Sequence, residues 1–116
     1  MLIIRRGNNM DLKTLAEQVD LEVEEYREMI ELFLQTVTLQ LHHLKAALET
    51  GDSQKVAETA HSIKGSSASL GLTQISGMAR GMELKARENN LNEAALAFQT
   101  IKAEIHQIAQ WVSDLR

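Results

Sequence analysis

The sequence predicts an all-α protein: an antiparallel up-down-up-down four-helix bundle with a short accessory N-terminal helix. Three observations favour this fold. Apolar residues recur every three or four positions through most of the 116-residue chain, no segment alternates with period two, and no proline interrupts a helix. Because the connections between the long helices are short, consecutive helices should be antiparallel neighbours.

The first two expected helices follow residues 1–9, which show no periodicity and predict a flexible lead-in. Asp11 is placed to cap a short helix that ends near residue 18 and covers one end of the bundle. A long helix over about residues 22–50 comes next and is followed by Gly51, a residue type typical of helix ends. Its apolar residues step by three or four throughout: Val23, Tyr26, Ile30, Phe33, Val37, Leu41, Leu44 and Leu48.

The last two expected helices begin near residues 73 and 91. Thr73 is placed to cap a helix that reaches about residue 88, within which Gly77 and Gly81 lie one turn apart and suggest close backbone packing against a neighbour. Asn90 and Glu93 have the spacing of a capping box for the final helix. The apolar residues of that helix again step by three or four: Leu91, Ala94, Phe98, Ile101, Ile105, Ile108, Val112 and Leu115.

Between these two pairs, Asp52 is placed to cap a helix over residues 53–70, which Gly71 ends. At about 100° per residue, His61 lies roughly 140° from the centre of the core stripe of this helix, so its imidazole should face outward. Lys64, Gly65, Ala57 and Ala68 fall within about 60° of it. The stripe itself consists of Val56, Ala60, Ile63, Ser67 and Leu70.

An outward histidine with these neighbours suits phosphoryl transfer. Gly65 and Ala68 leave open the space over the ring that an in-line phosphoryl donor or acceptor must occupy. A glycine inside a helix costs about 1 kcal/mol relative to alanine, so the missing side chain of Gly65 indicates a need for clearance. Lys64 can donate to phosphate oxygens, with Ser66 and Ser67 as secondary donors.

The run from His61 to Ala68, closed by Gly71, resembles the signature of histidine-containing phosphotransfer (HPt) domains of the stand-alone bacterial type. It also resembles the P1 domain of chemotaxis kinases. The resemblance covers most of the chain and implies a single HPt four-helix-bundle domain over residues 10–116. It further implies that His61 is the phospho-acceptor, that Lys64 and Gly65 surround it, and that Glu83 approaches it from the neighbouring helix.

Two interpretations of Glu83 stay open. Its carboxylate can accept a hydrogen bond from one imidazole nitrogen of His61, which fixes the tautomer and leaves the lone pair of the other nitrogen for phosphorus. Alternatively, Glu83 is a solvated helix residue that pairs with Arg80 or Arg87.

The resemblance implies a phosphorelay intermediate rather than an enzyme with its own ATP site. The sequence has neither a nucleotide-type glycine loop nor an Asp-Asn set for magnesium. The implied partners are receiver domains of hybrid sensor kinases and response regulators: one donates the phosphoryl group from its phospho-aspartate and another takes it onward. Mg²⁺ is expected on the receiver only. Two alternatives stay open, a P1-like domain loaded by a chemotaxis-type kinase core and a non-catalytic helical adaptor.

Composition excludes several other classes. A net charge of −4 and only four aromatic residues disfavour nucleic-acid binding, and no apolar run approaches the ~20 residues of a membrane span. The spacing of Glu58 and His61 is that of a di-iron ligand pair, but it occurs once, so we expect no metal and no cofactor. His42, His43 and His106 lack neighbours of the kind that surround His61, and we interpret them as surface or groove residues. The absence of cysteine fits a cytoplasmic address, and we expect a monomer.

Overall fold

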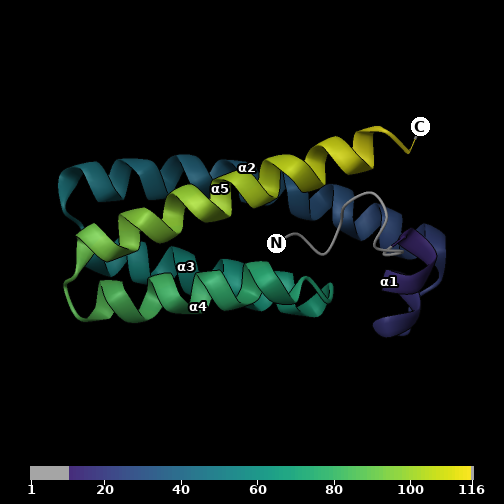
Figure 1. The fold of residues 1–116 in the computed structure, drawn as a ribbon, viewed down its shortest axis with the longest axis horizontal. Helices are drawn as coiled ribbons and strands as arrows, with labels where there is room; N and C mark the ends of the chain where they lie inside the picture. The colour runs from purple at the N-terminus through teal and green to yellow at the C-terminus, as the bar shows by residue number, and fades with distance from the viewer. Residues whose placement is uncertain (1–10, 116) are drawn as a thin grey trace.

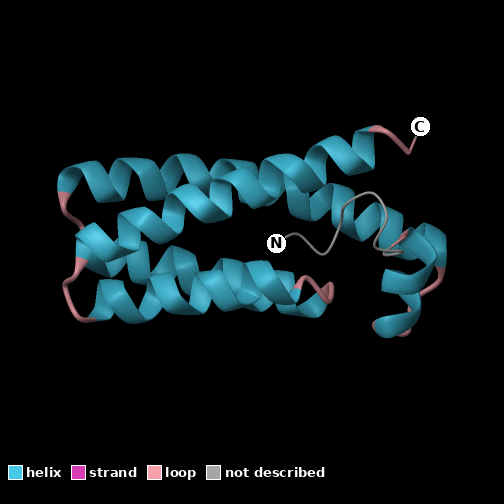
Figure 2. Cartoon of the chain, viewed as in Figure 1, coloured by secondary structure: helices cyan, strands magenta, loops and turns pink. Residues whose placement is uncertain are grey.

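The structure, a computed structural model, describes residues 11–115; the lead-in expected over residues 1–9 lies outside them. Within this range the chain forms five helices and no strand (Figures 1 and 2). The long helices α2 to α5 run alternately in opposite directions, and α1 lies across one end of the bundle against α2 (Figure 1). The predicted fold is confirmed. The helices are α1 (Leu12–Gln18), α2 (Val23–Thr50), α3 (Ser53–Ser69), α4 (Thr73–Arg87) and α5 (Leu91–Ser113).

The core runs along the bundle between the helices. Every residue of the stripe predicted on α3 is buried, and α1 contributes Leu12, Leu15 and Ala16 at the end of the bundle. Tyr26 of α2 is also buried, and its hydroxyl donates a 2.7 Å hydrogen bond to the carbonyl oxygen of Leu70, just after α3. The inward face of α3 is thereby held by apolar packing and, at its C-terminal end, by one buried hydrogen bond.

Side-chain caps start three of the helices where the sequence predicts them. Asp11 Oδ1 accepts from the backbone N–H of Thr14 at 2.8 Å, and Asp52 Oδ1 accepts from that of Lys55 at 3.0 Å. Asn90 Oδ1 caps α5 in the same way through a 3.2 Å bond. Gly51 has a φ of 75°, a left-handed conformation that glycine adopts without strain and that ends α2.

Two expectations about α4 are wrong. Its N-cap is Leu72, which is buried, and Thr73 is the first helical residue rather than the cap. The expected close packing at Gly77 and Gly81 is also absent, because a Cβ atom added at either position would meet nothing within 4 Å. Both glycines lie on the side of α4 turned away from its core residues, so their backbone faces open space.

Candidate functional site

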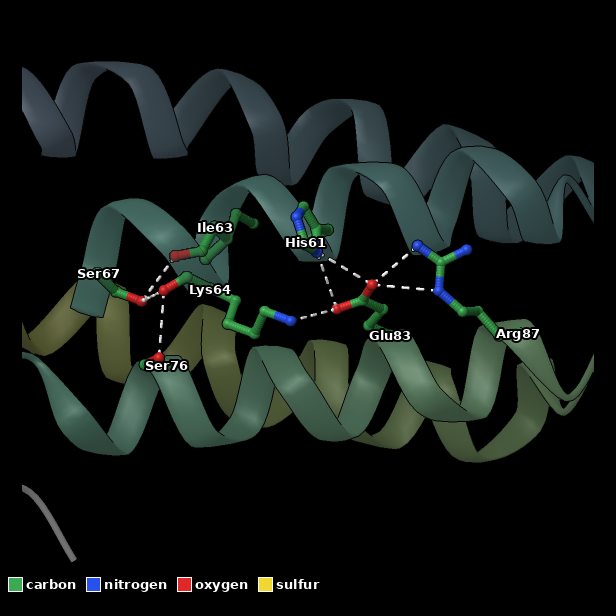
Figure 3. A network of polar contacts seen from close by, with 7 residues as sticks. All are labelled: His61, Ile63, Lys64, Ser67, Ser76, Glu83 and Arg87. Carbon is green, nitrogen blue, oxygen red and sulfur yellow. Dashed lines mark hydrogen bonds and ion pairs between the residues drawn. The ribbon is translucent and has the colours of Figure 1, made fainter. Parts of the chain in front are cut away.

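His61 projects from the outer side of α3 toward the seam between α3 and α4 (Figure 3). Its side chain is 63% exposed, in agreement with the outward orientation expected from the helical period. Ala57, one turn earlier, was expected to face outward as well, but it is buried. It lines a hollow together with Ala86 and Arg87 of α4, because α4 packs over that part of α3.

Glu83 of α4 lies directly beside the imidazole. Nδ1 of His61 is 3.1 Å from Oε2 and 3.3 Å from Oε1 of the Glu83 carboxylate. Nε2 of the ring makes no hydrogen bond to any residue between 11 and 115. The Glu83 side chain is only 9% exposed, so its charge depends on protein groups rather than on water for compensation.

Two cations compensate that charge from opposite sides (Figure 3). Lys64 of α3 donates from Nζ to Oε1 at 2.9 Å. Arg87, one turn after Glu83 on α4, donates to Oε2 from Nη2 at 2.8 Å and from Nε at 3.1 Å. Each carboxylate oxygen therefore has its own cationic donor, and the imidazole lies between the two donors.

This arrangement keeps the carboxylate ionised. The hydrogen bond from Lys64 is the largest cause that lowers the pKa of Glu83 to about 2, and the Arg87 hydrogen bonds and the nearby charges act in the same direction. Burial of the carboxylate opposes them by favouring the neutral form. At neutral pH the anionic oxygen beside Nδ1 is an acceptor, so it favours the tautomer with the proton on Nδ1.

The surface beyond the ring is open. A Cβ atom built on Gly65 would have no heavy atom within 4 Å, and both Gly65 and Ala68 are exposed. Ser66 bonds only to carbonyl oxygens of its own helix, and Ser67 is buried and does the same. The hydroxyls of both serines are therefore bonded within α3, whereas the sequence suggested them, at most, as secondary donors to phosphate oxygens.

A further hydrogen bond joins the two helices near the site. The hydroxyl of Ser76 on α4 donates to the carbonyl oxygen of Lys64 on α3 at 3.1 Å (Figure 3). Seven residues separate Ser76 from Glu83, which is two helical turns, so both side chains face α3. The hydrogen bond from Ser76 and the contacts of Glu83 both hold α4 against the turn of α3 that carries Lys64.

The structure brings together all four residues that the sequence singled out, His61, Lys64, Gly65 and Glu83, and adds Arg87. Both interpretations of Glu83 describe part of the geometry, because the carboxylate contacts the imidazole and also pairs with Arg87. The expectation that Glu83 is solvated is wrong, since α3 and α4 bury it. The spacing of four residues between Glu83 and Arg87 was the available signal, but it did not distinguish Arg87 from Arg80. Arg80 is exposed and makes no ion pair with Glu83.

The other histidines of the chain lie away from this site. His42, His43 and His106 are exposed on α2 and α5, as expected, and none has an acidic partner within the described part of the chain. In residues 11–115, no helix combines the length and the apolar character needed to cross a membrane.

Comparisons with known proteins point to one family. Residues 28–111 match the Hpt domain. Among solved structures, the chain is similar to histidine-containing phosphotransfer protein B (HptB) from Pseudomonas aeruginosa PAO1, with 27% sequence identity and a TM-score of 0.80. That match covers 93% of this chain and 94% of the other. No curated protein sequence matches significantly.

Proposed function

Because this chain belongs to the Hpt domain family, we propose that His61 accepts a phosphoryl group from the phospho-aspartate of one receiver domain and passes it to another. The observation that carries the proposal is the difference between the surroundings of the two ring nitrogens of His61. Nδ1 lies against Glu83, whereas Nε2 has no partner among the described residues and belongs to a side chain that is 63% exposed.

Nε2 is the nitrogen suited to attack phosphorus. When Nδ1 carries the proton and donates a hydrogen bond to Glu83, the free lone pair of the ring is on Nε2, in a side chain that is 63% exposed. Gly65 supports access from that side, since an incoming phosphoryl group meets no side chain one turn along the helix. The Lys64 ammonium contacts the same carboxylate oxygen that lies 3.3 Å from Nδ1 of the ring, so its two further N–H donors are placed to help bind phosphoryl oxygens.

In the proposed step, the Nε2–P bond forms as the P–O bond of the acyl phosphate breaks, and the receiver's aspartate leaves as a carboxylate. The phosphorylated ring retains the proton on Nδ1, and the Glu83 carboxylate compensates the positive charge of the ring. The reverse step uses the same arrangement, because a ring protonated at Nδ1 is a good leaving group from phosphorus. Mg²⁺ is expected on the receiver, beside its aspartate.

The receiver is proposed to dock on the seam between α2 and α3. An apolar hollow of about 270 Å³ opens there, and two of its α2 side chains, Met29 and Leu32, are 43% and 63% exposed. On the α3 side, Ser66 and Ser69 line the hollow one to two turns from His61, so the same partner could reach the ring. Exposed apolar surface of this kind is typical of protein-binding sites.

The test is phosphotransfer from receiver domains that have been loaded with labelled acetyl phosphate. The wild-type chain should acquire acid-labile, base-stable phosphate, and His61→Gln should acquire none while retaining its helix content. His43→Gln and His106→Gln, which remove exposed histidines elsewhere, should be labelled like the wild type. Labelling of His61→Gln would place the acceptor on another residue.

The same assay addresses the alternative functions. Loading by a chemotaxis-type kinase core with ATP, but by no receiver domain, would favour a P1-like domain. Absence of labelling with every donor, together with normal pathway signalling by His61→Gln, would favour a helical adaptor. Either result would contradict the proposed exchange between receivers.

A further inference from the structure

The two oxygens of the Glu83 carboxylate are held in different ways. Oε1 is bound by Lys64, whose ammonium ends a flexible stem and comes from the same helix as His61. Oε2 is bound by Arg87 through two N–H groups of one rigid guanidinium, at 2.8 and 3.1 Å. Oε2 is also the oxygen nearer to His61 Nδ1.

We propose that Arg87 is a positioning residue that acts through Glu83: it fixes Oε2 against His61 Nδ1 and so selects the tautomer whose free lone pair is on Nε2. The inference deepens the proposed function and rests on it for its biological meaning. The tautomer itself, however, is a property of the unphosphorylated protein and can be measured without any partner.

Geometry favours Arg87 over Lys64 for this role. The planar guanidinium donates from adjacent atoms, so it constrains the direction as well as the distance of the oxygen that it holds. Without Arg87, the carboxylate would still be paired with Lys64 at Oε1, and rotation toward the ammonium would carry Oε2 away from the ring. Lys64 alone therefore supplies charge without fixing the oxygen that contacts Nδ1.

The simpler explanation of the contact between Glu83 and Arg87 is a surface ion pair between residues four apart on a helix, which contributes little to stability. Arg87 itself is 55% exposed, so its loss should affect folding only slightly. Its partner is different: Glu83 is nearly buried between α3 and α4 and touches the proposed acceptor. An exposed cation that orients a buried anion can thus affect the ring without affecting the stability of the bundle.

The decisive measurement is the tautomer of His61 by long-range ¹H–¹⁵N NMR of the ring nitrogens in the unphosphorylated chain. Arg87→Met removes both the charge and the two guanidinium N–H groups that hold Oε2, whereas Arg87→Lys keeps the charge only. Arg80→Met is the matched control on the outer surface of the same helix. Wild type and Arg80→Met should show Nδ1–H predominantly. Arg87→Met should show a mixture of tautomers, with Arg87→Lys between them.

An unchanged tautomer in Arg87→Met would overturn the inference. Full rescue by Arg87→Lys would also overturn it, since the paired N–H groups of the guanidinium would then be irrelevant. The melting temperatures of the variants should agree closely with that of the wild type, which separates positioning from folding.

Loading of His61 by phosphorylated receivers gives the second readout. We expect the rate to fall about three- to tenfold in Arg87→Met, the size of effect typical of losing one ordinary hydrogen bond, because Arg87 acts on the ring only through Glu83, and to stay unchanged in Arg80→Met. An unchanged rate beside an altered tautomer would overturn the assigned role of Arg87 in transfer. If even the wild type is never labelled, the proposed function fails, while the NMR result still decides what Arg87 does.

Discussion

The inward and outward faces of α3 contrast sharply although they belong to the same 17 residues. The inward face consists of side chains such as Ile63 and Ala60 that are fully buried in the bundle. The outward face presents His61 and Gly65 to open space and makes its contacts through polar groups to α4. Because different residues serve the fold and the site, substitutions on one face should affect one property and spare the other.

The largest expected effect concerns the inward face. Ile63→Ala should destabilise the bundle by about 2–5 kcal/mol, because it removes a fully buried side chain and leaves a cavity. Urea unfolding would measure the loss. Phosphoryl acceptance per folded molecule should stay close to that of the wild type, since His61 lies two residues away on the other face. Loss of acceptance by the folded variant would show that the faces are not separable.

Gly65→Gln tests the outward face. Its helix propensity should leave the free energy of unfolding unchanged or raise it by up to about 1 kcal/mol, since Gly65 lies in a helix with space around it. The new side chain would occupy the space one turn from His61 and should slow phosphotransfer by roughly tenfold or more. Gly65→Ala should have a smaller effect, and Ala103→Gln, on the exposed side of α5, should have none. Equal transfer rates for all three variants would refute the need for clearance.

The smallest expected effect is a pH dependence of folding stability that comes from Glu83, a residue of the site. The pKa of Glu83 is lowered from 4.5 to about 2 in the folded protein, so the ionised carboxylate stabilises the fold above pH 4.5, and this contribution is lost as the pH falls toward 2. The effect should be modest because burial of the carboxylate opposes the hydrogen bonds from Lys64 and Arg87, and Arg87 is more than half exposed. Wild type should lose more stability than Glu83→Gln between neutral pH and about pH 3 in urea titrations. Parallel pH profiles would contradict a structural role for the charge.

Most of the fold could be predicted from the sequence because local signals agree with the tertiary arrangement. Apolar spacing placed all four long helices, and Asp11, Asp52 and Asn90 cap the helices that they were expected to cap. The errors arose where packing decides. Leu72 takes the N-cap position of α4 because its side chain is needed in the core, and Ala57 is buried because α4 covers it.

The site was predictable in its members but not in its connections. The helical period is enough to turn His61 outward and to place Lys64 and Gly65 beside it. Which side chains reach Glu83 depends on the axial register of α4 against α3, which no local pattern determines. The role of Arg87 follows from that register, as it holds the oxygen nearest to the ring.

The absorbance of Tyr26, whose hydroxyl is buried between α2 and the end of α3, can report when these two helices separate. Tyr26 is the chain's single tyrosine, and burial raises its pKa to about 12. Because folding favours the neutral phenol, its stabilising contribution is complete below pH 10 and disappears as alkaline conditions approach pH 12. Ionisation would also remove the proton donated to Leu70. Phenolate absorbance should therefore report when the C-terminal end of the histidine-bearing helix separates from α2.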